Sequence, residues 1–125
     1  MQLADVSSWW LEEEFAFGSA LAELDGDMDC YLEIADIYAQ EMPAQMASLR
    51  AAASSPLALA PLLHEVANTF GVLGAPLYVQ RIRSIEKSIR ADGTAFEPGD
   101  TAEATCLAMQ RTHDALRQWL QRRTG

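Results

Sequence analysis

Apolar residues recur at intervals of three and four along most of the chain, and this spacing is the feature that most constrains its fold. Such intervals place side chains on one face of an α-helix. Sustained alternation of apolar and polar residues is missing, and no Asn-Gly or Asp-Gly turn joins two β-branched runs. The sequence therefore predicts an all-α protein.

Prolines, glycines and capping residues divide the periodic sequence into four long helices. They are predicted over residues 28–53, 57–74, 76–91 and 101–123, with residues 94–100 as a loop and Asp100 or Thr101 as the last cap. Pro43 lies inside the first, but the apolar stripe continues in phase, so we expect a bend near residues 39–42. A short extra helix ends near Phe15, and Gly18 loosens the chain after it. These connections predict an antiparallel up-down four-helix bundle with a short extra N-terminal helix, in a single domain spanning residues 1–125.

The charge of the chain is strongly negative and unevenly distributed. Its net charge is −9, and residues 1–30 hold eight acidic side chains and no basic one. Four of the nine basic residues lie between Arg81 and Arg90. A negative chain is a poor match for nucleic acid. The asymmetry indicates either a solvated acidic face or a local basic patch for an anionic partner.

Two sequence features bear on where the protein works. No apolar run approaches the roughly 20 residues of a membrane span, and no basic segment followed by an apolar stretch resembles a secretory signal. Cys30 and Cys106 lack the spacing of a metal knuckle, so we expect free thiols. We therefore expect a cytoplasmic protein. The starting Met1 and the self-contained bundle favour a stand-alone protein over a piece of a hybrid kinase, and a monomer is the default expectation.

Residues 63–75, which read LHEVANTFGVLGA, surround the most informative side chain, His64. In helical projection the apolar face comprises Leu62, Val66, Phe70 and Leu73. The opposite side comprises Ala60, His64, Ala67, Asn68, Gly71 and Ala75. We therefore predict an exposed imidazole on a strip of small residues that a partner can approach closely. Gly71 has a second interpretation, in which it permits close packing of another helix.

This segment resembles the signature of histidine-containing phosphotransfer (HPt) domains, His-x-x-Lys-Gly-x-x-Gly-x-x-Gly-Ala. His64 matches the phospho-accepting histidine, and Gly71, Gly74 and Ala75 match the small residues that follow it. The resemblance implies a phosphorelay intermediate that accepts a phosphoryl group on His64 from a receiver-domain aspartate and passes it to another receiver. Its partners would be receiver domains of response regulators or hybrid histidine kinases, which supply Mg²⁺. The chain itself would bind no cofactor and perform no ATP chemistry.

Two positions depart from the HPt pattern. Ala67 stands where the family has lysine, and Asn68 stands where it has glycine. The Asn68 amide, one turn from His64, could reach a phosphoryl oxygen. Counting back along an antiparallel neighbouring helix brings Lys87 level with His64. Lys87, with Arg83 or Arg90, could therefore supply the missing positive charge, or these three could only keep an exposed face soluble.

The remaining candidates are weaker. A zinc-protease motif would need a second histidine where Asn68 stands, so we predict no metal site. His113 falls on the apolar stripe of the last helix and is expected to pack there. Trp9 and Trp10 either cap the core or bind a partner. The alternatives to phosphotransfer are a degenerate HPt-like module that binds a receiver or another signalling partner without being phosphorylated, and a purely structural bundle.

Overall fold

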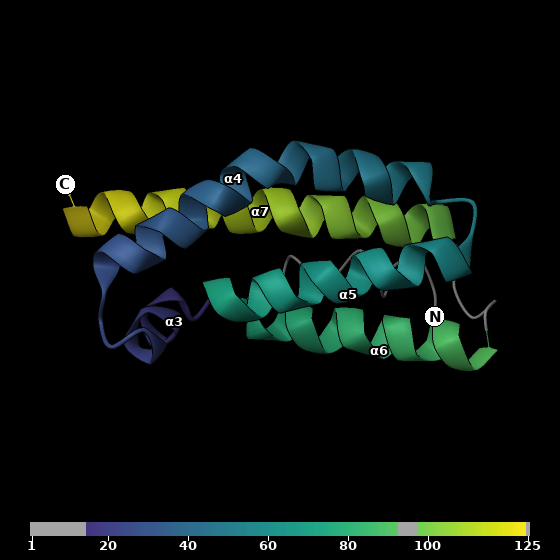
Figure 1. Cartoon of the computed structure of the whole chain (residues 1–125), viewed down its shortest axis with the longest axis horizontal. Helices are drawn as coiled ribbons and strands as arrows, with labels where there is room; N and C mark the ends of the chain where they lie inside the picture. Colours follow the sequence, from purple (N-terminus) through teal and green to yellow (C-terminus); the bar gives the residue numbers. More distant parts are fainter. Residues whose placement is uncertain (1–14, 93–97, 125) are drawn as a thin grey trace.

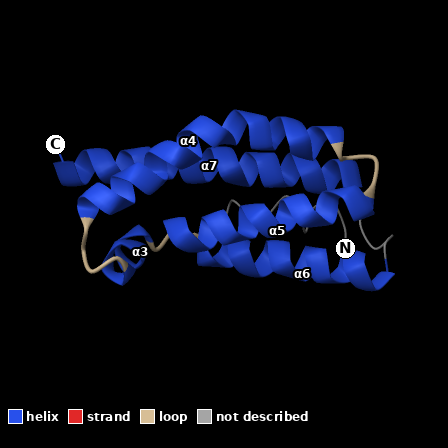
Figure 2. Ribbon diagram, in the orientation of Figure 1, coloured by secondary structure: helices blue, strands red, loops and turns tan. Residues whose placement is uncertain are grey.

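The computed structural model describes residues 15–92 and 98–124, and it is helical throughout these ranges apart from the connections (Figures 1 and 2). No strand occurs in them, which confirms the all-α prediction. The helices are α3 (Phe17–Glu23), α4 (Met28–Ala51), α5 (Pro56–Leu73), α6 (Pro76–Asp92) and α7 (Pro98–Thr124). The predicted helix ending near Phe15, together with Trp9 and Trp10, falls almost wholly outside the described residues.

Local signals set the helix boundaries. The Asp27 carboxylate caps α4 by accepting a hydrogen bond from the Cys30 amide at 3.0 Å. The Ser55 hydroxyl accepts one from the Ala58 amide at 3.3 Å and caps α5, which has a proline in its first turn. Gly74 ends α5 in a left-handed conformation with φ of 104°, and its amide donates to the Phe70 carbonyl.

Two boundary predictions are wrong. Gly18 does not loosen the chain but lies within α3, because the buried residues Phe17, Ala20 and Leu21 follow helical spacing while Gly18 faces solvent. The last helix begins at Pro98 rather than at residue 101, so Asp100 lies in its first turn instead of capping it. A proline is compatible with a helical first turn, since the amide it lacks has no partner there.

Helix α4 passes through Pro43 without interruption, as predicted from its apolar stripe. The helix visibly curves along its length in Figure 1. Buried side chains continue in phase on both sides of the proline, from Met42 to Leu49, and Pro43 itself is exposed. Packing of this continuous face offsets the hydrogen bond that proline removes.

Two pairs of helices lie side by side, α5 with α6 and α4 with α7 (Figure 1). Two buried tyrosine hydroxyls of α4 bind carbonyls of other helices, one within its own pair and one in the α5/α6 pair. Tyr31 donates to the Leu73 carbonyl at the end of α5, and Tyr38 donates to the Met109 carbonyl of α7, both at 2.7 Å. The Leu73 carbonyl belongs to the last turn, where no intrahelical donor remains. The packing is that of a helical bundle, and no helix in the described residues has the length and apolarity of a membrane span.

Candidate functional site

His64 lies on α5 beside α6, and its imidazole is accessible. Its side chain is 56% exposed, and Nδ1 lies 3.1 Å from Oε1 of Glu86 on α6. The Glu86 side chain is only 12% exposed. Its second oxygen accepts a hydrogen bond from Arg90 Nε at 3.0 Å. Three side chains therefore form a chain of contacts from the arginine through the carboxylate to the imidazole.

This contact determines which ring nitrogen of His64 is open. An ionised carboxylate can only accept hydrogen bonds, so the nitrogen beside Glu86 must carry its proton. In the neutral imidazole the other nitrogen, Nε2, then keeps its lone pair. Nε2 is therefore the ring nitrogen that can act as a nucleophile, and the contact between Nδ1 and Glu86 fixes the orientation of the ring.

A second contact between the helices lies about one turn along from the first. Arg83 Nη2 on α6 donates to Oδ1 of Asn68 at 3.3 Å. Both side chains are exposed. Because the Asn68 oxygen accepts from the guanidinium, its NH₂ group remains a possible donor to a ligand. Arg83 and Asn68 are therefore held together about one turn from His64.

The predicted register of α6 against α5 is correct within one residue, but the residue that faces His64 is different. Glu86, not Lys87, contacts the imidazole. Residues 86 and 87 differ by about 100° around the helix, so Lys87 points away from the α5 interface. Within the described part of the chain, no hydrogen bond or ion pair joins Lys87 to another residue. Of the three predicted cations, Arg83 and Arg90 are engaged at the site and Lys87 is exposed beside it.

The predicted strip of small exposed residues is partly wrong. His64, Asn68 and Gly71 are exposed, whereas the two helical alanines Ala60 and Ala67 are 2% and 0% exposed. The buried face of α5 is wider than the projection assumed, because it also includes Leu59 and Leu63. Ala75, just beyond α5, is also completely buried. All three alanines belong to the hydrophobic core, so they are not available for docking.

Gly71 and Gly74 match the same sequence signature but lie in different environments. A Cβ added at Gly71 would meet only Val79 Cγ2, at 3.8 Å, so the backbone there is open. A Cβ at Gly74 would lie 2.6 Å from the Ala16 carbonyl oxygen. The Ala16 amide also donates to the Gly74 carbonyl at 2.7 Å. Gly71 therefore contributes open surface, and Gly74 contributes a tight chain reversal against the start of α3.

Sequence reasoning did not select Glu86 as a site residue. The sequence did point to the neighbouring position, because counting residues along the two antiparallel helices led to Lys87. Glu86 and Arg90 also have the i, i+4 spacing of a helical ion pair. Residue counting fixes the level along a helix, but a one-residue error rotates the position by about 100°. Only packing of α6 on α5 identified the carboxylate.

The other candidates lie away from His64. His113 is half-buried, with its ring centroid 6.4 Å from that of Tyr38, which agrees with the predicted packing role. Cys30 and Cys106 are free thiols, the second of them buried. Burial raises the pKa of the Cys106 thiol.

Comparisons with protein-family profiles, with curated proteins and with solved structures found no match to this chain. The geometry at His64 and the resemblance in residues 63–75 are therefore the grounds on which a function can be argued. The structure adds the contacts of these side chains, since Glu86 lies beside His64 and Arg83 donates to Asn68.

Proposed function

We propose that this protein is a phosphorelay intermediate of the HPt type, in which His64 accepts a phosphoryl group from a receiver-domain aspartate and passes it to another receiver. The observation that carries the proposal is the exposed His64 imidazole whose Nδ1 contacts the Glu86 carboxylate. That contact leaves Nε2 as the nitrogen available to a partner. The resemblance of residues 63–75 to the HPt signature supports the same atom-level role.

The proposed transfer follows from this arrangement. The Nε2 lone pair attacks phosphorus, the P–N bond forms, and the bond between phosphorus and the aspartyl oxygen breaks, leaving a free carboxylate on the receiver. The Nδ1 proton stays in place, so the ring becomes positively charged as the bond forms. The Glu86 carboxylate, 3.1 Å away, stabilises that charge. Transfer to the second receiver is the reverse chemistry on a different aspartate.

Positive charge near the incoming phosphoryl group would come from α6. Arg90 is opposed by Glu86, so these two largely cancel each other. Arg83 is held against the neutral Asn68 amide and keeps its full charge. Arg83 with Asn68 is therefore our first choice for contacts to phosphoryl oxygens, and Lys87 comes second. Phosphoryl transfer depends mainly on positioning and charge neutralisation, which suits a site of this kind.

We take the helical bundle to be an antiparallel up-down four-helix bundle, formed by α4 to α7, with α3 as an additional short helix. The receiver would bind Mg²⁺ and supply most of the reacting groups. This chain would act as a cytoplasmic monomer without ATP chemistry of its own.

Ala67 favours a second candidate function. This residue replaces the lysine of the HPt signature, and its side chain is completely buried. A chain with no cation at that position could bind a receiver domain or another signalling partner without being phosphorylated. Binding and phosphorylation therefore need separate measurement.

The test is transfer of radiolabelled phosphate from a panel of phosphorylated receiver domains. The proposal expects acid-labile, base-stable label on the protein and none on the His64→Gln variant. Glu86→Leu should slow transfer, whereas Lys87→Glu, one residue away, should change it less than Arg83→Glu. If neither the parent nor His64→Gln acquires label from any receiver but both bind one, the binding-module function is correct instead. A normal rate in Glu86→Leu would refute the role assigned to that carboxylate.

A further inference from the structure

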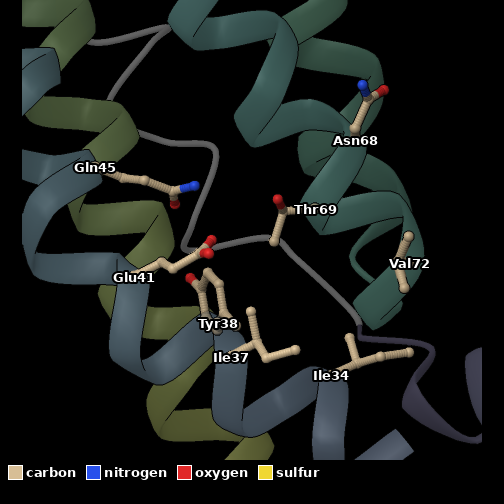
Figure 3. A pocket seen from close by; sticks show the side chains of 8 residues that line it. All are labelled: Ile34, Ile37, Tyr38, Glu41, Gln45, Asn68, Thr69 and Val72. Atoms are coloured by element: carbon tan, nitrogen blue, oxygen red, sulfur yellow. The ribbon is translucent and has the colours of Figure 1, made fainter. Parts of the chain in front are cut away.

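A hollow of about 440 Å³ lies on α7 and shares no residue with the proposed His64 site. It is lined by Phe15, just before α3, and by side chains of α7 between residues 107 and 118. The hollow between α4 and α5 differs in this respect, because it is lined by Asn68, which belongs to the His64 site (Figure 3). The α7 hollow is therefore a separate surface, and its occupant need not be a partner in phosphoryl transfer.

The α7 side of this hollow has the residue spacing of a helix-packing face. Leu107, Arg111, Asp114 and Gln118 recur at intervals of three and four, over about 16 Å at 1.5 Å per residue. Leu107 is 49% exposed, and Asp114 and Gln118 are also exposed. Within the described part of the chain, Phe15 is the only residue outside α7 that lines the hollow. The stripe therefore has the pattern of a packing face but lacks a covering element among the described residues.

Arg111 carries the unpaired charge of the α7 hollow. Its Nε is buried and has no acceptor, and no hydrogen bond or ion pair joins its guanidinium to another described residue. Asp114, about one turn along, accepts a hydrogen bond from Gln110 Nε2 at 3.1 Å instead. A half-buried guanidinium without a counter-ion favours a carboxylate, which can accept from its outer Nη groups.

Residues 1–14 lie outside the described part of the chain and join it at Phe15, which itself lines the hollow. They include no basic residue and four acidic ones, three of which, Glu12 to Glu14, directly precede Phe15. Two large apolar side chains, Trp9 and Trp10, come just before these glutamates. Fourteen residues span about 21 Å as a helix and more when extended, so the segment is long enough to cover the stripe.

We propose that the α7 hollow is the docking site of the chain's own residues 1–14. The indoles of Trp9 and Trp10 would cover Leu107, and a carboxylate among Glu12 to Glu14 would accept from the Nη groups of Arg111. Attachment at Phe15 gives the segment an effective concentration of the order of millimolar at the hollow. A second copy has no such advantage, and each copy has a net charge of −9, so that association is opposed by repulsion.

The first test is an NMR measurement on the isotopically labelled full chain. We expect nuclear Overhauser effects between the indole protons of Trp9 or Trp10 and the methyl groups of Leu107. In a mixture of labelled and unlabelled chains, these effects should remain within one molecule. Effects between molecules would overturn the proposal in favour of a second copy. Random-coil chemical shifts for residues 1–14, without effects to α7, would overturn it altogether.

Hydrogen exchange of matched variants then tests the two contacts. Backbone amides of residues 9–14 should exchange at least about tenfold more slowly than in an unstructured chain. Arg111→Glu should abolish most of this protection, and so should Leu107→Ser, which removes an exposed side chain rather than a core contact. Arg122→Glu makes the same charge change at an exposed residue of α7 that does not line the hollow, and it should leave the protection unchanged.

Two further comparisons separate docking from general effects on the fold or the charge. Amides of α4, which does not line the hollow, should exchange at the parent's rate in every variant. Adding lysine at positions 12, 13 and 14 to Arg111→Glu should restore part of the protection, because the opposite charges are then exchanged. Full protection in both Arg111→Glu and Leu107→Ser would overturn the proposal, and an equal loss in Arg122→Glu would refute the specific role of Arg111.

Discussion

Replacing Gly71 with alanine should stabilise the protein, although this glycine matches the HPt signature. Gly71 lies inside α5 and is exposed. A glycine in a helix interior costs about 1 kcal/mol relative to alanine, mainly because its unfolded backbone is freer. The added Cβ would meet Val79 Cγ2 at 3.8 Å, an ordinary van der Waals distance. We therefore expect the free energy of unfolding to rise by about 0.5–1 kcal/mol.

Gly74→Ala provides the opposing control. Gly74 has φ of 104°, where a Cβ costs about 1–2 kcal/mol. The same Cβ would lie 2.6 Å from the backbone oxygen of Ala16, so the start of α3 would have to move. The loss of stability should therefore exceed about 2 kcal/mol. The two substitutions are chemically identical and differ only in their surroundings.

Urea unfolding followed by far-UV circular dichroism measures both changes, and phosphate transfer is measured on the same samples. If a receiver docks on the surface beside His64, Gly71→Ala should slow transfer while it raises stability. A change of activity opposite in direction to stability cannot arise from partial unfolding. The reasoning from Cβ surroundings would be refuted if Gly71→Ala unfolded more easily than the parent, or if Gly74→Ala were equally stable.

Three further outcomes follow from the buried tyrosine and the two thiols. Tyr38→Phe should lower the free energy of unfolding by about 1 kcal/mol, because the phenol no longer donates to the Met109 carbonyl; an unchanged urea midpoint would contradict this. Burial raises the pKa of Tyr38, so the native protein retains this proton after the unfolded chain begins to release it near pH 10. The resulting stability is present below about pH 10 and is lost as the pH rises further, so unfolding titrations above about pH 10 should show a steeper decline in the parent than in Tyr38→Phe. Finally, a thiol reagent should modify half-buried Cys30 well before buried Cys106. Burial blocks access to the Cys106 thiol and also raises its pKa, so less of the reactive thiolate is present. Equal rates of modification would contradict this and would show that α7 opens readily.

The helices could be predicted closely from the sequence because their signals are local. The apolar spacing, the Asp27 and Ser55 caps and the left-handed Gly74 act within a turn or two of each boundary. The exceptions also have local explanations. At Gly18 the burial of Phe17 and its neighbours outweighs the weak helix preference of glycine.

The site could be predicted only in part. His64 and Asn68 are exposed as expected, but the facing residue on α6 is Glu86 rather than Lys87. Register along a helix pair follows from counting residues, whereas rotation about the helix axis follows from how the two surfaces interdigitate. The partner of the imidazole therefore required tertiary packing.

The sequence by itself determined that the protein is helical, where its long helices lie, and that His64 stands on the solvent side of one of them. Only the tertiary structure decided what surrounds that histidine. Ala60 and Ala67 are buried while Gly71 is open. In a helical projection these small residues look alike, because a missing side chain is equally compatible with bare surface and with close approach of another helix. The packing of the helices separates the two cases, and it places the Glu86 carboxylate of α6 beside Nδ1 of the imidazole.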